Sequence, residues 1–163
     1  MKKGISLIEL LVVMVIVSII LLIIMNLTSY VIQRSRFSGA VNNLISDIAW
    51  SKQIAAKENR WVKFMFTTRN YIISKQVKIG DLTNWKQIKK VIPYDNKPFF
   101  NTNDITDFAI NSRGEVKKVS DLNNPSSSPS TITIKIYIKK GGKKLFHRTI
   151  IIFPYGGVKV EKK

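Results

Sequence analysis

The stretch GISLIELLVVMVIVSIILLIIM, residues 4–25, decides the fold of this chain. From Ile5 to Met25 it is apolar except at Ser6, Glu9 and Ser18. About 20 apolar residues are enough to cross a bilayer as an α-helix. The sequence therefore predicts a membrane-spanning helix close to the N-terminus.

The residues that flank this stretch predict its orientation. Lys2 and Lys3 precede it, and the positive-inside rule keeps them cytoplasmic and exports the C-terminal bulk. A cleaved secretory signal would have a shorter apolar core followed by a small-residue cleavage site, and none follows here. The only attractive cleavage point lies before the apolar run, at Gly4.

Glu9 is the unusual residue of the apolar stretch. A carboxylate inside hydrocarbon costs at least ~3 kcal/mol, and ionisable residues in membrane segments are candidates for function. Two interpretations are open at this point. Glu9 either reaches the headgroup boundary, or it has a role that requires it to be buried.

The helical pattern continues beyond the membrane stretch, since no proline occurs before Pro93. Apolar residues recur at helical spacing, which predicts a core-facing side: Val41, Leu44, Ile45, Ile48 and Ala55. The opposite, polar side is expected to carry Asn42, Asn43, Asp47 and Lys52. Lys57, Asn59 and Arg60 are typical of a helix C-terminus.

The rest of the chain reads as β-strands. Residues 61–66 and 70–77 are β-rich runs, residues 85–94 form a weaker one, and two short strands meet at Arg113-Gly114. The runs 131–140 and 143–153 predict a hairpin, followed by a last strand in GGVKV, residues 156–160. We therefore predict an α+β fold in which a long N-terminal helix, half membrane and half amphipathic, packs on a C-terminal antiparallel β-sheet domain. Its core should bring Ile45 and Ile48 against the alternating isoleucines Ile132, Ile134 and Ile136.

The charge is strongly positive. The chain has 27 basic and 10 acidic residues, a formal charge of +17, which favours polyanions such as nucleic acid, anionic lipid or acidic wall polymers. A lysine-rich composition that only keeps the surface soluble is the alternative. Lys139, Lys140, Lys143 and Lys144 bracket Gly141-Gly142, so a hairpin tip would present four ammonium groups, with Arg148 and Lys159 nearby in the sequence.

Catalytic and metal-binding patterns are not found in the sequence. The chain lacks cysteine, and its single histidine, His147, is expected to face solvent on a strand. No G-x-S-x-G elbow, phosphate loop or dinucleotide fingerprint is present. Residues 101–107, NTNDITD, are rich in oxygen ligands but lack the spacing of a calcium loop. We expect no enzyme, no cofactor and no metal site.

The N-terminus resembles the signal of type IV pilins and pseudopilins. Lys2-Lys3-Gly4 and then ISLIE, residues 5–9, match a basic leader, a glycine, an apolar first mature residue and a glutamate as the fifth mature residue. Ile5 stands where phenylalanine or methionine is commoner. The segments SDIAWSKQIAAKENRWVKF, FAINSRGEV and RTIIIFPYGGVKV resemble minor pseudopilins of the GspH/FimT type. Asn26 occupies the region where major pilins often carry a proline.

This resemblance implies cleavage by a prepilin peptidase between Gly4 and Ile5, followed by N-methylation of Ile5. The carboxylate of Glu9 would then neutralise the Ile5 amine of the next subunit in a helical filament. The implied organisation is a leader over residues 1–4, a membrane or filament-core helix over 5–26, an amphipathic half over 27–60 and an antiparallel β domain over 61–163.

The function implied is a minor pilin or pseudopilin, a structural, priming or tip subunit of a type IV pilus-like or type II secretion filament. Its partners would be the prepilin peptidase, other pilins and the bacterial cytoplasmic membrane, with the N-terminus cytoplasmic and the C-terminal domain exported. The alternative is a pilus-borne DNA receptor for natural transformation, in which Lys159 matches a basic position of the DNA-binding members. A third possibility is a membrane-anchored domain that never assembles.

Overall fold

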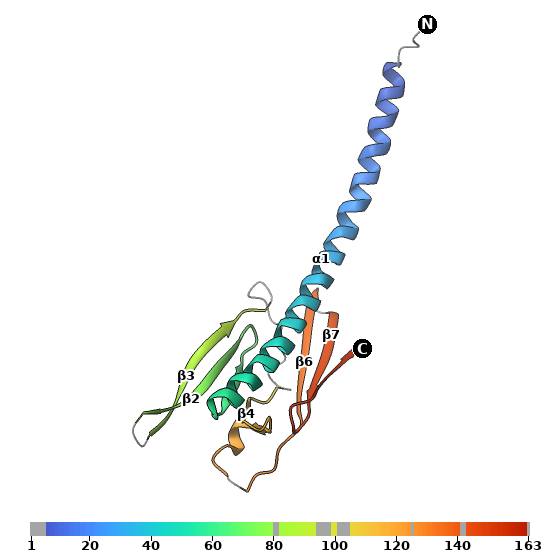
Figure 1. Ribbon diagram of the computed structural model, residues 1–163. Coiled ribbons are helices and arrows are strands. Elements are labelled where there is room, and N and C mark those ends of the chain that lie inside the picture. Colours follow the sequence, from blue (N-terminus) through green and yellow to red (C-terminus); the bar gives the residue numbers. More distant parts are fainter. Residues whose placement is uncertain are drawn as a thin grey trace. The chain divides into compact units, whose positions relative to one another are not determined.

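The structure, a computed structural model, describes residues 6–79, 82–93, 99–100, 105–124, 126–140 and 143–162. The chain divides into two compact units, Met1–Arg36 and Phe37–Lys163, which are described separately below. Figure 1 gives the order of the helix and strands. The first unit contains the N-terminal part of the long helix, and the second contains its C-terminal part and the β-strands.

The helix α1 runs from Leu7 to Glu58, so the predicted continuous helix is confirmed. Gly39 lies inside it without interrupting it. The helix ends at Asn59, whose φ of 49° is left-handed, and the amide of Arg60 donates to the carbonyl oxygen of Ala55 at 3.1 Å. This combination is the Schellman type of helix C-terminus, in which an asparagine tolerates the left-handed position.

The strands form two antiparallel sheets rather than one. The larger has the order β3-β2-β1-β4-β5 and the smaller the order β6-β7-β8. The strand bounds are β1 Val62–Phe66, β2 Tyr71–Ile79, β3 Leu82–Val91, β4 Phe108–Ile110, β5 Val116–Lys118, β6 Ile132–Lys140, β7 Lys143–Ile152 and β8 Val158–Lys162, with a 3-10 helix η2 at Val119–Asp121. Every predicted strand is therefore present, and the strand order is what the sequence left open.

Backbone contacts among the described residues join the two sheets. The amide of Ser130 donates to the carbonyl oxygen of Val116 in β5 at 2.8 Å, just before β6 begins. On another side, Phe100 forms an isolated antiparallel bridge with Ile136 of β6. The sheets therefore curve around a common interior, which the C-terminal half of α1 fills.

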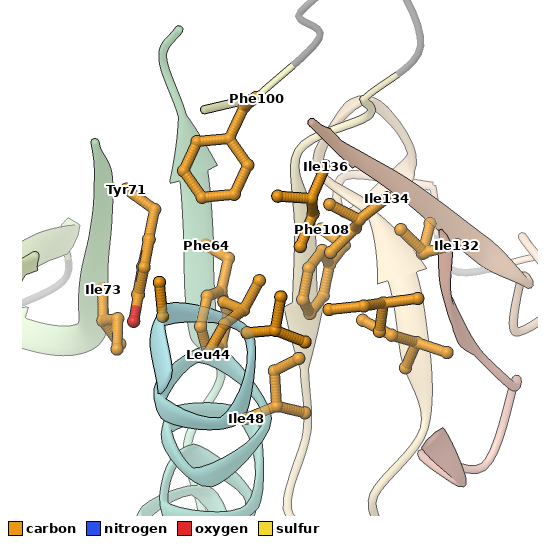
Figure 2. Close-up of a cluster of buried hydrophobic side chains, with 14 of the residues drawn as sticks. Leu44, Ile48, Phe64, Tyr71, Ile73, Phe100, Phe108, Ile132, Ile134 and Ile136 are labelled. Atoms are coloured by element: carbon orange, nitrogen blue, oxygen red, sulfur yellow. The ribbon is translucent and has the colours of Figure 1, made fainter. Parts of the chain in front are cut away.

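This interior is one continuous apolar core, shown in Figure 2. Leu44 and Ile48 of α1 are fully buried together with Ile132, Ile134 and Ile136 of β6, as predicted, while Ile45 is partly buried against the same cluster. Aromatic rings fill the space beneath the larger sheet: Phe64, Phe66, Tyr71, Phe99, Phe100 and Phe108. No core residue precedes Phe37 among the described residues.

One prediction about the helix is wrong. Asp47 was expected on the polar side of α1, but only 6% of it is exposed. The hydroxyl of Tyr71 donates to its Oδ2 at 2.6 Å, and Lys89 forms an ion pair with its Oδ1. The sheet reaches farther around the helix than the apolar stripe indicates, so it covers this carboxylate and supplies its partners. Burial and the neighbouring carboxylate raise the pKa of Tyr71 above its usual range.

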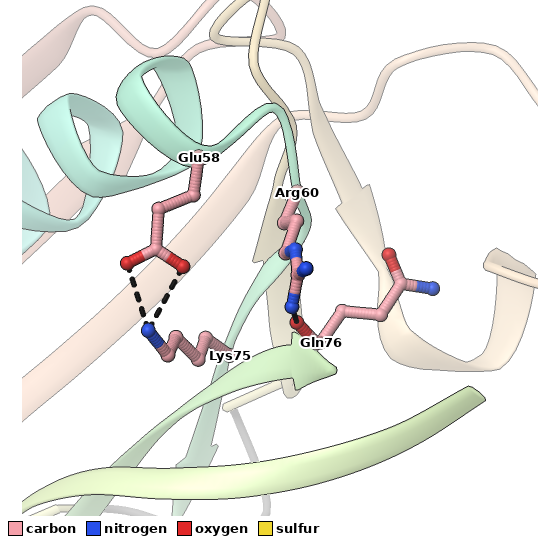
Figure 3. Close-up of polar contacts among 4 residues, drawn as sticks. All are labelled: Glu58, Arg60, Lys75 and Gln76. Atoms are coloured by element: carbon pink, nitrogen blue, oxygen red, sulfur yellow. Dashed lines mark hydrogen bonds and ion pairs between the residues drawn. The ribbon is translucent and has the colours of Figure 1, made fainter. Parts of the chain in front are cut away.

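A surface ion pair fixes the C-terminal turn of α1 to β2 (Figure 3). The ammonium of Lys75 donates to both carboxylate oxygens of Glu58, at 2.7 and 2.8 Å, and this contact lowers the pKa of Glu58. Beside it, Arg60 Nη1 donates to the carbonyl oxygen of Gln76 at 3.2 Å. These contacts set Lys75 on the helix side of the sheet and Gln76 on the other.

Candidate functional site

The N-terminal part of α1 carries an apolar surface that is exposed among the described residues. The helix is long and apolar enough to cross a membrane, and none of its most apolar stretch is buried. Leu7 is 82% exposed and Leu22 is 65% exposed. Residues 7–24 therefore require a cover from outside the chain, because large apolar surfaces in contact with water mark membrane or protein contacts.

Glu9 lies in the first turn of this helix and is exposed. It is the only ionisable residue between positions 6 and 24. The other polar side chain along the stretch, Ser18, donates to the carbonyl oxygen of Met14 at 2.8 Å and is satisfied within the helix. A carboxylate in the first turn is favoured by the helix dipole, but a single such charge inside an apolar assembly still needs a cationic partner. Gly4 and Ile5, the predicted cleavage and methylation residues, lie outside the described residues.

The predicted basic hairpin is formed by β6 and β7. Lys139 lies opposite Lys144 and Lys140 opposite Lys143, so the backbone brings four lysine positions together at one end of the smaller sheet. Their side chains, and Gly141-Gly142, lie outside the described part of the structure. The two strands therefore pair as the predicted antiparallel hairpin, with an irregularity in the register between Ile138 and Lys139.

Arg148 and Lys159 do not join that cluster on one surface. Arg148 lies two residues before Ile150 and four before Ile152, both buried, and so shares their core side of β7. Lys159 is opposite Ile151 and therefore lies on the other side of the sheet. Lys159 Nζ is 2.9 Å from Glu161 Oε1, and this ion pair offsets its charge.

Among the described residues, no group of three or more histidine, cysteine, aspartate or glutamate side chains could hold a metal ion. Asp107 accepts a hydrogen bond from the amide of Phe66 at 2.9 Å, so it serves the backbone of β1. Residues 101–104 of the oxygen-rich segment lie outside the described residues. His147 lies on β7 opposite Tyr137.

The N-terminal segment defines the class of signal that the chain carries. Residues 1–25 match the prokaryotic N-terminal methylation motif, which is the prepilin type of signal. By family, this motif implies processing by a prepilin peptidase and assembly with other pilins. Together with the apolar helix it indicates anchoring in the inner membrane before assembly. Proteins of this class are structural subunits and not enzymes.

Among solved structures, the chain is similar to the crystal structure of the type IV minor pilin FimU of Pseudomonas aeruginosa. The sequence identity is 12%, the TM-score is 0.49, and the similarity covers 76% of this chain and 91% of the FimU chain. No curated protein sequence matches this chain. The α+β fold rests on the helix and the two sheets described above.

Proposed function

We propose that this chain is a minor pilin or pseudopilin, a structural, priming or tip subunit of a type IV pilus-like or type II secretion filament. The observation that carries this proposal is the exposed apolar surface of residues 7–24, with Glu9 as its single charge, which lies within the methylation motif matched over residues 1–25. Neighbouring helices of other subunits would cover the apolar surface once the chain leaves the membrane.

In this proposal a prepilin peptidase cleaves between Gly4 and Ile5, and the new amine of Ile5 is methylated. That amine stays cationic, and the Glu9 carboxylate of a neighbouring subunit neutralises it. A buried charge without a partner is strongly unfavourable, while a well-aligned pair offsets much of the cost of removing both groups from water. The pair would then fix the axial register between subunits, as a buried polar residue does in coiled coils.

Processing is tested by intact mass in cells with an active prepilin peptidase. The membrane form should lack Met1–Gly4, and Gly4→Leu should abolish the cut. Gly39→Leu is the matched control, because Gly39 is exposed inside the helix with open space around its Cα. Full-length wild-type protein in such cells would refute the processing step.

Assembly is tested with Glu9→Gln, which removes the charge and keeps the size. The variant should insert into the membrane as well as the wild type but be incorporated less into filaments or their initiating complex. Glu58→Gln, at the other end of the same helix, should assemble normally. Wild-type incorporation of Glu9→Gln would support the interpretation in which Glu9 only reaches the headgroup boundary.

A second candidate function is a pilus-borne DNA receptor for natural transformation. The observation in its favour is the β6–β7 register, which brings four lysine positions together on a chain of charge +17. Contacts to phosphates predict that the logarithm of the DNA affinity falls linearly with the logarithm of the salt concentration, with a slope of about −0.9 per phosphate neutralised. Glutamine at Lys139, Lys140, Lys143 and Lys144 should flatten this slope. The same change at four exposed lysines elsewhere should flatten it less: Lys57, Lys78, Lys86 and Lys90.

A further inference from the structure

Two tryptophans lie on the side of the larger sheet that faces away from α1. Val62 and Phe64 of β1 are buried beneath the helix, so Trp61 and Lys63, which alternate with them, face the other side. Gln76 also faces that side. Its backbone N–H donates to the backbone carbonyl oxygen of Trp61 at 2.9 Å. Gln76 is opposite Trp85 of β3. Trp61, directly before β1, therefore forms one row with Gln76 of β2 and Trp85 of β3.

A cavity of about 260 Å³ lies along this row. Besides Trp61, Gln76 and Trp85, it is lined by Val119, Leu122 and Asn123, at and just after the 3-10 helix η2. The two tryptophans are two interstrand spacings apart, roughly 10 Å along the backbone. The cavity is thus lined by two indoles and by two carboxamides, those of Gln76 and Asn123.

A second, larger cavity of about 490 Å³ shares Trp61 with the first and is cationic. Arg60, Arg113 and Lys117 line it, while Glu115 is its only acidic lining residue. Among the described residues, the side chains of Arg113 and Lys117 have no acidic partner and make no other polar contact. Arg60 Nη1 donates to the backbone carbonyl oxygen of Gln76 at 3.2 Å. This hollow therefore carries a net charge of about +2 at neutral pH.

A hydrogen-bonded turn over residues 111–115 contributes to the lining of this second cavity. Asn111 Oδ1 accepts from the amides of Arg113 at 2.9 Å and Glu115 at 2.8 Å, and Asn111 Nδ2 donates to Glu115 Oε2 at 2.6 Å. Gly114 has a φ of 79°, which a glycine adopts without strain. In this turn the carboxylate of Glu115 accepts a hydrogen bond from Asn111, while the guanidinium of Arg113 lines the cavity. The site therefore favours an anionic group.

We propose that the two cavities form one cleft that binds an acidic oligosaccharide. The apolar faces of sugar rings pack on Trp61 and Trp85, and the carboxamides of Gln76 and Asn123 bind hydroxyl groups. The carboxylate of an acidic sugar lies in the second cavity, bound by Arg113 and its two cationic neighbours. Large aromatic surfaces with a few polar groups are what small-ligand clefts use for affinity and orientation.

The uneven distribution of charge favours a glycan over a single-stranded nucleic acid. A phosphodiester chain needs cations along its whole path, next to its stacked bases. Here the three cations lie on one side of Trp61. Near Trp85 the recorded cation is Lys63, whose Nζ lies 4.4 Å from the ring centroid and covers that ring. A sugar ring that packs on Trp85 displaces Lys63, whose ammonium then remains available to the ligand.

The test uses the full chain in detergent micelles with trigalacturonate as the acidic probe. Maltotriose is the neutral probe, and a short oligothymidylate is the nucleic-acid probe. Calorimetry should show binding of trigalacturonate at least ten-fold tighter than that of maltotriose. Trp61→Ala should weaken binding of both sugars ten-fold or more. Arg113→Gln combined with Lys117→Gln should weaken only the acidic probe.

Matched controls are present in the same chain. Trp50→Ala removes an exposed tryptophan of α1 outside the cleft, and Arg69→Gln with Lys118→Gln makes the same charge change at exposed positions. All three control changes should leave the affinities within two-fold. The conservative Trp61→Phe should retain part of the affinity for both sugars. It replaces Trp61→Ala in the test if the alanine variant does not fold.

Three results would overturn the proposal. The first is no binding of trigalacturonate at millimolar concentration. The second is an equal loss in the cleft variants and in their controls, which would indicate a general attraction of polyanions. The third is tighter binding of oligothymidylate that depends on Trp61, which would make the cleft a nucleic-acid site.

Discussion

The contact between Tyr71 and Asp47 gives the sharpest test of what stabilises the unit Phe37–Lys163. Tyr71 is fully buried, and its hydroxyl donates to Asp47 Oδ2 at 2.6 Å. Tyr71→Phe deletes the hydroxyl and leaves that buried oxygen without its donor, while the ring keeps its contacts with Phe64 and Phe100. Hydrogen bonds to charged groups contribute about 1.5–3 kcal/mol. We expect the free energy of unfolding to fall by about 2 kcal/mol.

The measurement is the urea unfolding of a chain that begins at Gln33, monitored by tryptophan fluorescence. This truncation removes the exposed apolar helix and keeps all described core residues, which begin at Phe37. Tyr155→Phe is the matched control, because Tyr155 is 74% exposed. It should change the free energy by less than about 0.5 kcal/mol.

The same contact predicts an alkaline effect. The pKa of Tyr71 is raised in the folded chain, so above pH ~10 the unfolded chain loses this proton while the folded chain keeps it. The unfolded state then binds fewer protons, and stability falls as pH rises, by up to ~1.4 kcal/mol per pH unit. Tyr71→Phe should lack this component. Equal costs for Tyr71→Phe and Tyr155→Phe, or identical alkaline profiles of Tyr71→Phe and the wild type, would refute the reasoning.

Three further predictions use the same unfolding assay. The lysine partner of Glu58 lowers its pKa, so Glu58→Gln should cost about 0.2–1 kcal/mol at pH 7, and this difference should vanish as pH falls below the ordinary value of 4.5. Gly156→Ala should cost at least ~1–2 kcal/mol, because φ is 73° and a Cβ would lie 2.9 Å from a backbone oxygen. Gly157→Ala, whose nearest contact is 3.4 Å away, is its control. Ile134→Ala should cost ~2–5 kcal/mol, against a small change for the exposed Ile92→Ala.

The long helix and the strands could be predicted because their signals are local. Absence of proline, apolar spacing and strict alternation of isoleucines each depend on a short window, and each gave the correct element. The capping at Asn59 followed from its residue type in the same way. Pairing was not predictable to the same degree, because the sequence does not say which strand lies beside which. The division into two sheets came only with the structure.

Asp47 shows why the local pattern failed at the edge of the helix. It lies three residues after Leu44 and one before Ile48, so it borders the apolar stripe rather than opposing it. Whether such a residue is buried depends on how far the sheet extends around the helix. Its partners, Tyr71 and Lys89, are 24 and 42 residues away in the sequence, so no local pattern could indicate them.

The cleft was missed for a related reason. The alternation of Trp61 and Lys63 with buried neighbours was a signal that Trp61 faces away from the core. The position of Trp85 beside it depends on the β2–β3 register, which contains an irregularity between Ile73 and Ser74. The three cations of the second cavity come from two segments. Arg60 directly follows α1, whereas Arg113 and Lys117 lie in the β4–β5 hairpin, and only the folded chain brings the two segments together.

The apolar core begins at Phe37, which has a consequence for how folding is related to the surroundings of the N-terminal helix. Residues 7–24 contribute nothing to the described interior of the domain, so the free energy of folding does not depend on what surrounds them. In the proposed assembly, lipid is exchanged for protein around the N-terminal stretch while the domain that begins at Phe37 keeps its structure. That domain then has to fold only once, and its fold is unaffected by later changes around the N-terminal stretch.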